Sequence, residues 1–201
     1  MKRIFTTLSL ITAFTLAAKA QNSIQLNYGF RKPSGTEVNQ AFRSNDGAGI
    51  TFLHKAPGSN WAFGGTWTSQ SFSSDSNYFG SGYKTFMDIN NLLFSLRKDV
   101  RFKREHTVYW GIDLGLAYYD QCQTEGNNKD EMGNTGFTTG FVLGSDWKID
   151  NRFSIDVHGS YHYTYTDDIR YADKFTVSDF KYWGLNLGVK YQFGKAVKKQ
   201  G

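Results

Sequence analysis

Residues 183–193 read WGLNLGVKYQF, and this stretch decides the fold. Its large apolar side chains stand at every second position, and glycine, asparagine, lysine and glutamine fill the positions between them. Successive side chains of a β-strand point to opposite faces of the sheet, whereas an amphipathic helix repeats every 3.6 residues. The stretch therefore predicts a strand with one apolar face and one polar face.

The same alternation recurs in seven earlier segments of the chain. They begin near Ile24, Ile50, Trp61, Ile89, Val108, Phe137 and Phe153. Each continues for about ten residues, the length of a tilted strand that crosses a membrane. The segment from Ile89 changes phase near Asn90 and Asn91, where we expect a β-bulge. The predicted fold class is all-β, with eight antiparallel strands.

Long and short connections alternate between these segments. Residues 31–45, 73–84, 120–134 and 167–179 form long polar connections, and residues 55–60, 98–106 and 148–152 form shorter ones. A Greek-key sandwich does not predict this regular alternation. An up-and-down barrel does, because its long loops lie at one rim and its short turns at the other.

We expect the apolar rows to face lipid. A layered barrel core is filled by about twelve side chains, and the apolar phase of this chain holds many more. Aromatic residues gather near both ends of the segments, as they do at the two interfaces of a bilayer. The lipid-facing band is predicted to contain Ile112, Leu114, Val157, Leu187 and Val189. The alternative is a soluble extracytoplasmic barrel of lipocalin type, whose inward apolar face would bind a small apolar ligand.

The first twenty residues have the features of a secretory signal peptide. Lys2 and Arg3 precede an apolar run, and Ala18-Lys19-Ala20 offers a small-x-small cleavage site. We expect cleavage after Ala20, a barrel over residues 21–193, a short basic tail over residues 194–201, and a place in the cell outer membrane. The leader holds three of the 23 basic residues and no acidic one, so the net charge falls from +5 to +2. Nothing then suggests a nucleic-acid partner.

The chain resembles small outer-membrane β-barrel proteins, the group of the OmpA membrane domain and OmpX. The resemblance covers residues 23–193 and is carried by the signal peptide, the eight alternating segments and the closing stretch with its terminal aromatic residue. It implies that the outer-membrane assembly machinery recognises Leu185, Leu187, Val189, Tyr191 and Phe193. It also implies that lipid and lipopolysaccharide surround the barrel. We expect a structural or surface-interaction role, in which the long loops meet an extracellular ligand.

A lipid A-modifying enzyme is a further alternative. Lipid A deacylases among such barrels use a His-x-Ser pair, and His158-Gly159-Ser160 has this spacing, with Asp156 on the same face. Same-face neighbours on a strand lie about 7 Å apart, however, and here they point into the lumen. The asparagine that should follow the serine is missing. We therefore expect no catalytic residue, metal or cofactor, and we interpret Cys122 as a residue of a solvated loop.

The charged residues of the polar face are expected to meet inside the barrel. Asp113, Asp156, His158, His162 and Lys190 share the inward phase, with Arg31 and Lys55 near the strand ends. Buried charges must pair or be neutralised. We predict a polar network that plugs the lumen, so that the barrel does not act as a general porin.

Overall fold

The computed structural model describes residues 21–35, 41–74, 83–101, 105–125, 128–171 and 175–193. The predicted signal peptide (1–20) and basic tail (194–201) lie outside the described residues. In the described part of the chain, no helix is both long and apolar enough to cross a membrane.

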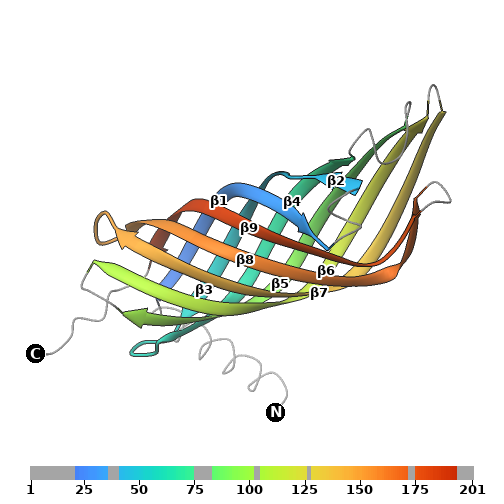
Figure 1. Ribbon diagram of the computed structural model, residues 1–201. Coiled ribbons are helices and arrows are strands. Elements are labelled where there is room, and N and C mark those ends of the chain that lie inside the picture. Colours follow the sequence, from blue (N-terminus) through green and yellow to red (C-terminus); the bar gives the residue numbers. More distant parts are fainter. Residues whose placement is uncertain are drawn as a thin grey trace, which may run out of the picture.

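The described residues form one closed antiparallel sheet (Figure 1). Its eight long strands are β1 (Gln21–Ser34), β3 (Asn45–Lys55), β4 (Trp61–Ser74), β5 (Tyr83–Arg101), β6 (His106–Glu125), β7 (Asn128–Lys148), β8 (Phe153–Tyr171) and β9 (Phe175–Phe193). Each long strand pairs with the next one along the chain, and β9 pairs with β1 to close the barrel. A two-residue strand, β2 (Phe42–Arg43), pairs with β4. The predicted eight-stranded up-and-down barrel is confirmed.

The barrel has two different ends. At the turn end, Asn22 of β1 pairs with Phe193 of β9, and short connections join β3 to β4, β5 to β6 and β7 to β8. At the hairpin end, β4 meets β5, β6 meets β7 and β8 meets β9. In Figure 1 the turn end lies at the lower left and the hairpin end at the upper right.

The connection between β3 and β4 illustrates how the sequence specifies the turn end. The backbone N–H of Ser59 donates to the carbonyl of Ala56 across 3.1 Å, and Pro57 and Gly58 occupy the central positions. Gly58 has a φ of 75°, which a residue with a side chain rarely adopts. Proline favours the first central position of such a turn and glycine the second. Pro57 and Gly58 therefore specify the tight turn that joins β3 to β4.

The strands extend further at the hairpin end than the sequence predicts. β5 to β9 are 19–21 residues long. The residues predicted as a loop over 120–134 belong to β6 and β7 wherever they are described, and Cys122 lies opposite Glu131 in the ladder. The loop assignment of Cys122 is therefore wrong. These extensions lack large apolar residues at alternate positions, so periodicity does not mark them as strands.

The expected bulge at Asn90 and Asn91 is also wrong. Both residues keep a continuous register with β4 and with β6. The inward positions of β5 run without interruption through Met87, Ile89, Asn91 and Leu93, each at most 2% exposed. The apparent change of phase comes from apolar residues that point inward at the hairpin end. The register shift that the described pairs do show lies between Tyr165 and Ile169 of β8.

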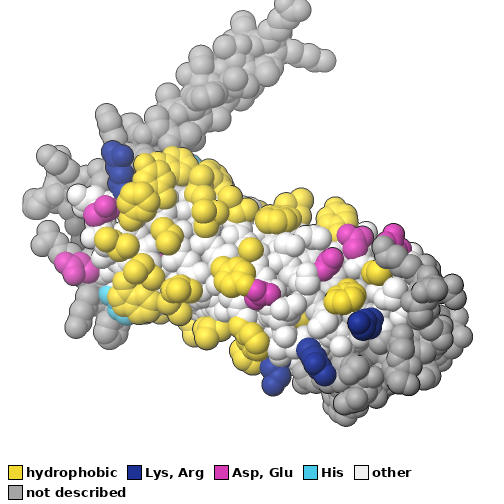
Figure 2. Space-filling model, turned by 90° about the horizontal axis from the view of Figure 1, so that it is seen from above, with side chains coloured by type: hydrophobic (Ala, Val, Ile, Leu, Met, Phe, Trp, Pro, Cys, Tyr) yellow, Lys and Arg dark blue, Asp and Glu magenta, His cyan; other side chains and the backbone are white. Residues whose placement is uncertain are grey.

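The apolar rows face outward. Leu187 is 62% exposed whereas its neighbour Asn186 is 1% exposed, and Ile112, Leu114 and Val189 follow the same outward phase. Val157 shares that phase and is half-buried. Figure 2 shows apolar side chains gathered over the half of the barrel nearer the turn end, with charged side chains towards both ends. A soluble barrel would turn this face inward, so the lipocalin-like alternative is wrong and the fold is that of a transmembrane barrel.

Candidate functional site in the barrel lumen

A carboxylate cluster centred on Asp156 occupies the lumen towards the turn end. The Asp156 carboxylate accepts hydrogen bonds from Gln25 Nε2 and from the Tyr109 hydroxyl, each across 2.6 Å. His158 Nδ1 lies against the same carboxylate. Asp156 is completely buried, so these partners replace the water it would otherwise bind. Three strands, β1, β6 and β8, are thereby joined through one side chain.

Two lysines form ion pairs beside this cluster. Lys190 of β9 donates to Asp146 Oδ2 across 2.6 Å, and both residues are buried. Nearer the turn end, Lys55 of β3 pairs with Asp99 of β5. Each pair joins strands that are not neighbours in the sheet, so each contact passes over the intervening strand on the lumen side.

An arginine clamp lies in the middle of the lumen. Arg97 Nη1 and Nη2 bind the two oxygens of Asp113 across 2.7 and 3.2 Å, and Ser95 adds a hydrogen bond of 2.6 Å to the same carboxylate. His162 Nε2 lies 3.5 Å from Asp113 Oδ2. A bidentate guanidinium–carboxylate pair fixes both direction and distance. The clamp therefore holds β5, β6 and β8 together.

Inward glycines make room for these large side chains. A Cβ atom built on Gly144 would lie 2.5 Å from the ring of Tyr109 and 2.6 Å from Cβ of His158. One built on Gly140 would lie 2.4 Å from the ring of His162. The polar face thus combines long side chains with glycines opposite them, and this combination fills a narrow barrel.

Tyr182 links the polar lumen to an apolar region at the hairpin end. Its hydroxyl accepts hydrogen bonds from Gln70 Nε2 (2.9 Å) and Asn91 Nδ2 (2.8 Å). These neutral groups form a layer of their own between the charged residues and the apolar ones. Beyond this layer, the ring of Tyr182 contacts Phe72 at 6.0 Å.

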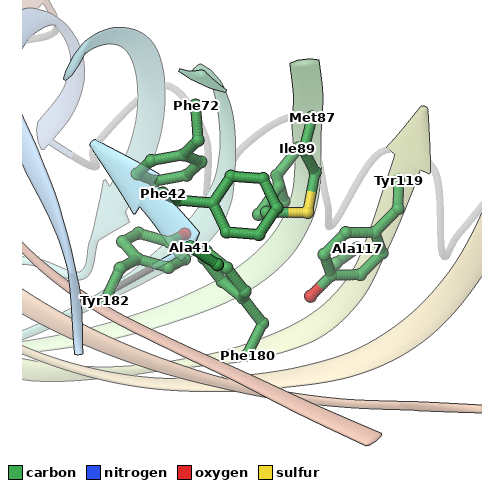
Figure 3. Packing of buried hydrophobic residues seen from close by; sticks show 9 residues of the cluster. All are labelled: Ala41, Phe42, Phe72, Met87, Ile89, Ala117, Tyr119, Phe180 and Tyr182. Atoms are coloured by element: carbon green, nitrogen blue, oxygen red, sulfur yellow. The ribbon is translucent and has the colours of Figure 1, made fainter. Parts of the chain in front are cut away.

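The apolar region forms a cap across the lumen (Figure 3). Its buried members are Ala41, Phe42, Phe72, Met87, Ile89, Ala117, Tyr119, Phe180 and Tyr182. Ala41 and Phe42 come from the segment around β2, which brings the Phe42 ring within 6.2 Å of Phe180. The other members come from the walls, on β4, β5, β6 and β9. Apolar side chains that pack in this way leave few voids between them.

Two cavities lined by described residues lie on the other side of the cap. A cavity of about 140 Å³ at the turn end is lined by charged and polar residues that include Lys55, Asp99, Asp146 and Lys190. A second cavity of about 20 Å³ lies deeper, between the arginine clamp and His158. Among the described residues, both cavities thus lie in the polar part of the lumen, towards the turn end.

The structure places all five predicted network residues inside the barrel, each at most 9% exposed. It brings Asp156 together with His158, and Asp113 together with His162. Lys190 contacts Asp146, a residue that was not among those predicted. Arg31 is buried, and its Nη1 donates to the carbonyl of Phe30 across 3.3 Å.

Three of the most connected lumen residues were not predicted as members of the network. Arg97, Tyr109 and Asp146 each stand on the inward phase of their strand. Continuing the two-residue period from Ser95 to Arg97, and from Gly144 to Asp146, would have found two of them. The cap residues had no such signal, because an inward apolar residue breaks the pattern that identifies the inward face.

Asp156, His158 and Ser160 all face the lumen from β8. His158 Nδ1 is engaged by Asp156, with Gln25 Nε2 3.4 Å away. Ser160 is buried in the lumen wall and so lies away from the outward, lipid-facing surface. Among the described residues, no group of three or more His, Cys, Asp and Glu side chains could hold a metal ion.

The fold defines a class, the small eight-stranded transmembrane β-barrels. The chain is similar to Neisserial surface protein A, with a TM-score of 0.58, 14% identity, and coverage of 86% of this chain and 97% of that one. It is also similar to a major outer membrane protein from Thermus thermophilus (TM-score 0.63, 13% identity, 87% and 99% coverage).

A third similar structure is Ail, the attachment invasion locus protein of Yersinia pestis, in complex with the heparin analogue sucrose octasulfate. Its TM-score is 0.54 at 16% identity, over 87% of this chain and 99% of that chain. No family model and no curated protein matches the sequence. At these identities the likeness is one of fold.

Proposed function

We propose that the protein is a closed outer-membrane barrel with a structural or surface-interaction role. The apolar cap carries this proposal, because it fills the hairpin end with nine buried residues. The arginine clamp and the lysine pairs add charged contacts inside the lumen below the cap. Solutes would have to displace both layers in order to pass.

Placement in the outer membrane is supported by the outward apolar wall and by the structures that share the fold. The assembly machinery would read Leu185, Leu187, Val189, Tyr191 and Phe193 on the closing strand, β9. Lipid and lipopolysaccharide would then surround the barrel, with the hairpin end outside the cell and the turn end in the periplasm. An outer-membrane fraction that shows heat-modifiable gel mobility is the expected result, and release into the soluble periplasm would contradict the placement.

The surface role is assigned to the hairpin end. There the strands extend beyond the apolar band and carry polar side chains, as on β6 and β7. Neisserial surface protein A and Ail share this barrel architecture, and Ail was solved with a sulfated ligand. These likenesses support a surface-exposed barrel.

Planar-bilayer recording tests the closed lumen. The purified protein is expected to give no stable conductance step, and a general porin reconstituted in parallel serves as the positive control. Phe42→Ala is expected to remain closed as well, because the Arg97–Asp113 clamp lies below the cap. A stable large conductance from the unmodified protein would overturn the proposal.

A further inference from the structure

A lysine lies between two tryptophans on the outer wall near the turn end. Trp61 of β4, Lys98 of β5 and Trp110 of β6 are direct cross-strand neighbours in one row. The Lys98 ammonium lies 5.2 Å from the ring of Trp61 and 6.0 Å from the ring of Trp110. The two indoles also contact each other edge to face at 5.6 Å. This geometry holds the cation by cation–π attraction on both sides.

Lys98 has no acceptor for its hydrogen bonds within the described part of the chain. Its described interactions are the two ring contacts. The next carboxylate along β5, Asp99, binds Lys55 on the inward face. An ammonium group carries three N–H donors, and leaving them without acceptors in an apolar environment is costly. An acceptor from outside the chain is therefore favoured at this position.

The surroundings define the chemistry of that acceptor. The next outward row towards the middle of the barrel is Phe63, Leu96 and Ile112, and on the other side Val100 is 49% exposed. The lysine thus lies at the edge of the apolar wall, where lipid headgroups meet acyl chains. The oxygen-rich anion available at that depth is the phosphate of a phospholipid. A free phosphate ion would gain nothing from the flanking apolar residues.

We propose that Lys98, Trp61 and Trp110 form a binding site for the phosphate of a glycerophospholipid in the leaflet at the turn end. The ammonium donates to the phosphate oxygens, and the acyl chains lie along Phe63 and Ile112. The inference rests on the membrane placement proposed above. It does not depend on whether the lumen is closed.

The opposite end of the barrel offers a matched control. Lys181 of β9 lies 5.1 Å from the ring of Tyr163, so it too makes a cation–π contact on the outer wall. Its ammonium already binds Asp179 across 3.0 Å. An internal carboxylate therefore takes the place that a lipid phosphate is proposed to take at Lys98.

Lipid titration followed by native mass spectrometry tests the site. The full-length mature protein is refolded in a non-ionic detergent, and dioctanoyl phosphatidylglycerol is added while bound lipids are counted. Lys98→Met keeps the apolar stem and is expected to weaken the tightest lipid interaction about fivefold, the effect of one cation near a phosphate surface. Lys98→Arg should retain binding, and Lys181→Met should change it less than about twofold.

Three results would overturn the proposal. Lys98→Met could bind the lipid as tightly as the unmodified protein, or Lys181→Met could weaken binding equally. Alternatively, excess inorganic phosphate could displace the lipid, which would indicate a general anion site. Heat-modifiable mobility of each variant verifies that it is folded. A protein that fractionates as soluble would refute the membrane placement itself, so the two failures are distinguishable.

Discussion

The two ends of the lumen are filled by different chemistry. Towards the hairpin end the interior is an apolar cap whose buried members include no charged residue. Towards the turn end it is a set of ion pairs around a cavity of about 140 Å³. A single strand passes through both regions, because the inward positions of β5 include Ile89 in the cap and Arg97 in the clamp.

This difference predicts different responses to substitution. Apolar side chains need only close packing, so losing one leaves a cavity whose effect is local. Buried charges need a specific partner, so losing one leaves the other uncompensated in a poorly solvated site. The turn half should therefore be the more sensitive to the loss of a charged group, and the hairpin half to the loss of apolar volume.

The largest effect is expected for Asp113→Ala. The substitution leaves Arg97 buried without its carboxylate partner, and removing one member of a buried ion pair costs about 3–5 kcal/mol. Urea unfolding of the refolded protein in detergent or liposomes measures the loss. The double variant Arg97→Met with Asp113→Leu removes both charges and is expected to recover most of the stability. A loss below about 1 kcal/mol for Asp113→Ala would contradict the assigned role of the pair.

A smaller effect is expected from Ile89→Ala in the cap. Ile89 is completely buried, and removing its side-chain carbons should cost about 3 kcal/mol through lost packing and a new cavity. Lys84→Ala, an exposed position on the same strand, is the control and should stay within about 0.5 kcal/mol. The same urea unfolding experiment compares them. Equal effects at both positions would show that the cap adds little stability.

Adding volume tests the close approach in the turn half. Gly144→Ala places a methyl group against Tyr109 and His158, so strain of about 1–3 kcal/mol is expected. Gly159→Ala is the matched control, because the nearest atom to its added methyl would be the Gly184 carbonyl oxygen at 3.9 Å. That variant should be neutral or slightly stabilising. Comparable losses in the two variants would point to a backbone effect instead of a lumen contact.

The sequence was sufficient to predict the barrel and the direction of its two faces. The alternation around Leu187 and Asn186 reports which side chain points outward, since an outward position in lipid must be apolar over the whole span. The same rule failed at Ile89, where an apolar residue points inward. Periodicity alone cannot distinguish an inward apolar residue from a change of register.

Pairing inside the lumen could be predicted only in part. The inward phase identified Asp113, Asp156 and Lys190, but partners such as Asp146 depend on how far each side chain reaches over its neighbouring strands. The cap depends on the segment around Phe42, which folds against β9 from a distant part of the sequence. Neither the Lys190–Asp146 contact nor the Phe42–Phe180 contact produces a pattern within one short stretch of sequence. The β6–β7 extension was missed for a related reason, since strands outside lipid need no apolar face.

The smallest effect is expected at a turn outside both halves of the lumen. Asp150 Oδ1 accepts hydrogen bonds from the backbone N–H groups of Arg152 (2.6 Å) and Phe153 (2.8 Å) in the connection between β7 and β8. These hydrogen bonds lower the pKa of the Asp150 carboxyl below its usual value. A carboxyl with a lowered pKa in the folded state stabilises the protein above its unfolded pKa, and the contribution is lost as the pH falls through the folded pKa.

Asp150→Asn separates the contribution of the Asp150 carboxyl to the pH dependence of stability from that of the charged residues in the lumen. The amide oxygen can still accept both backbone hydrogen bonds, so the turn should keep its shape while the charge-dependent contribution disappears. Unfolding measured from neutral to acidic pH should show a slightly shallower loss of stability for the variant, with the difference confined to the acidic end. Because the residue is exposed, solvent keeps the change small. If the two proteins already differed in unfolding free energy near neutral pH, the Asp150 carboxyl would be coupled to another titrating group. Its effect on stability would then not be independent of the charged residues of the lumen.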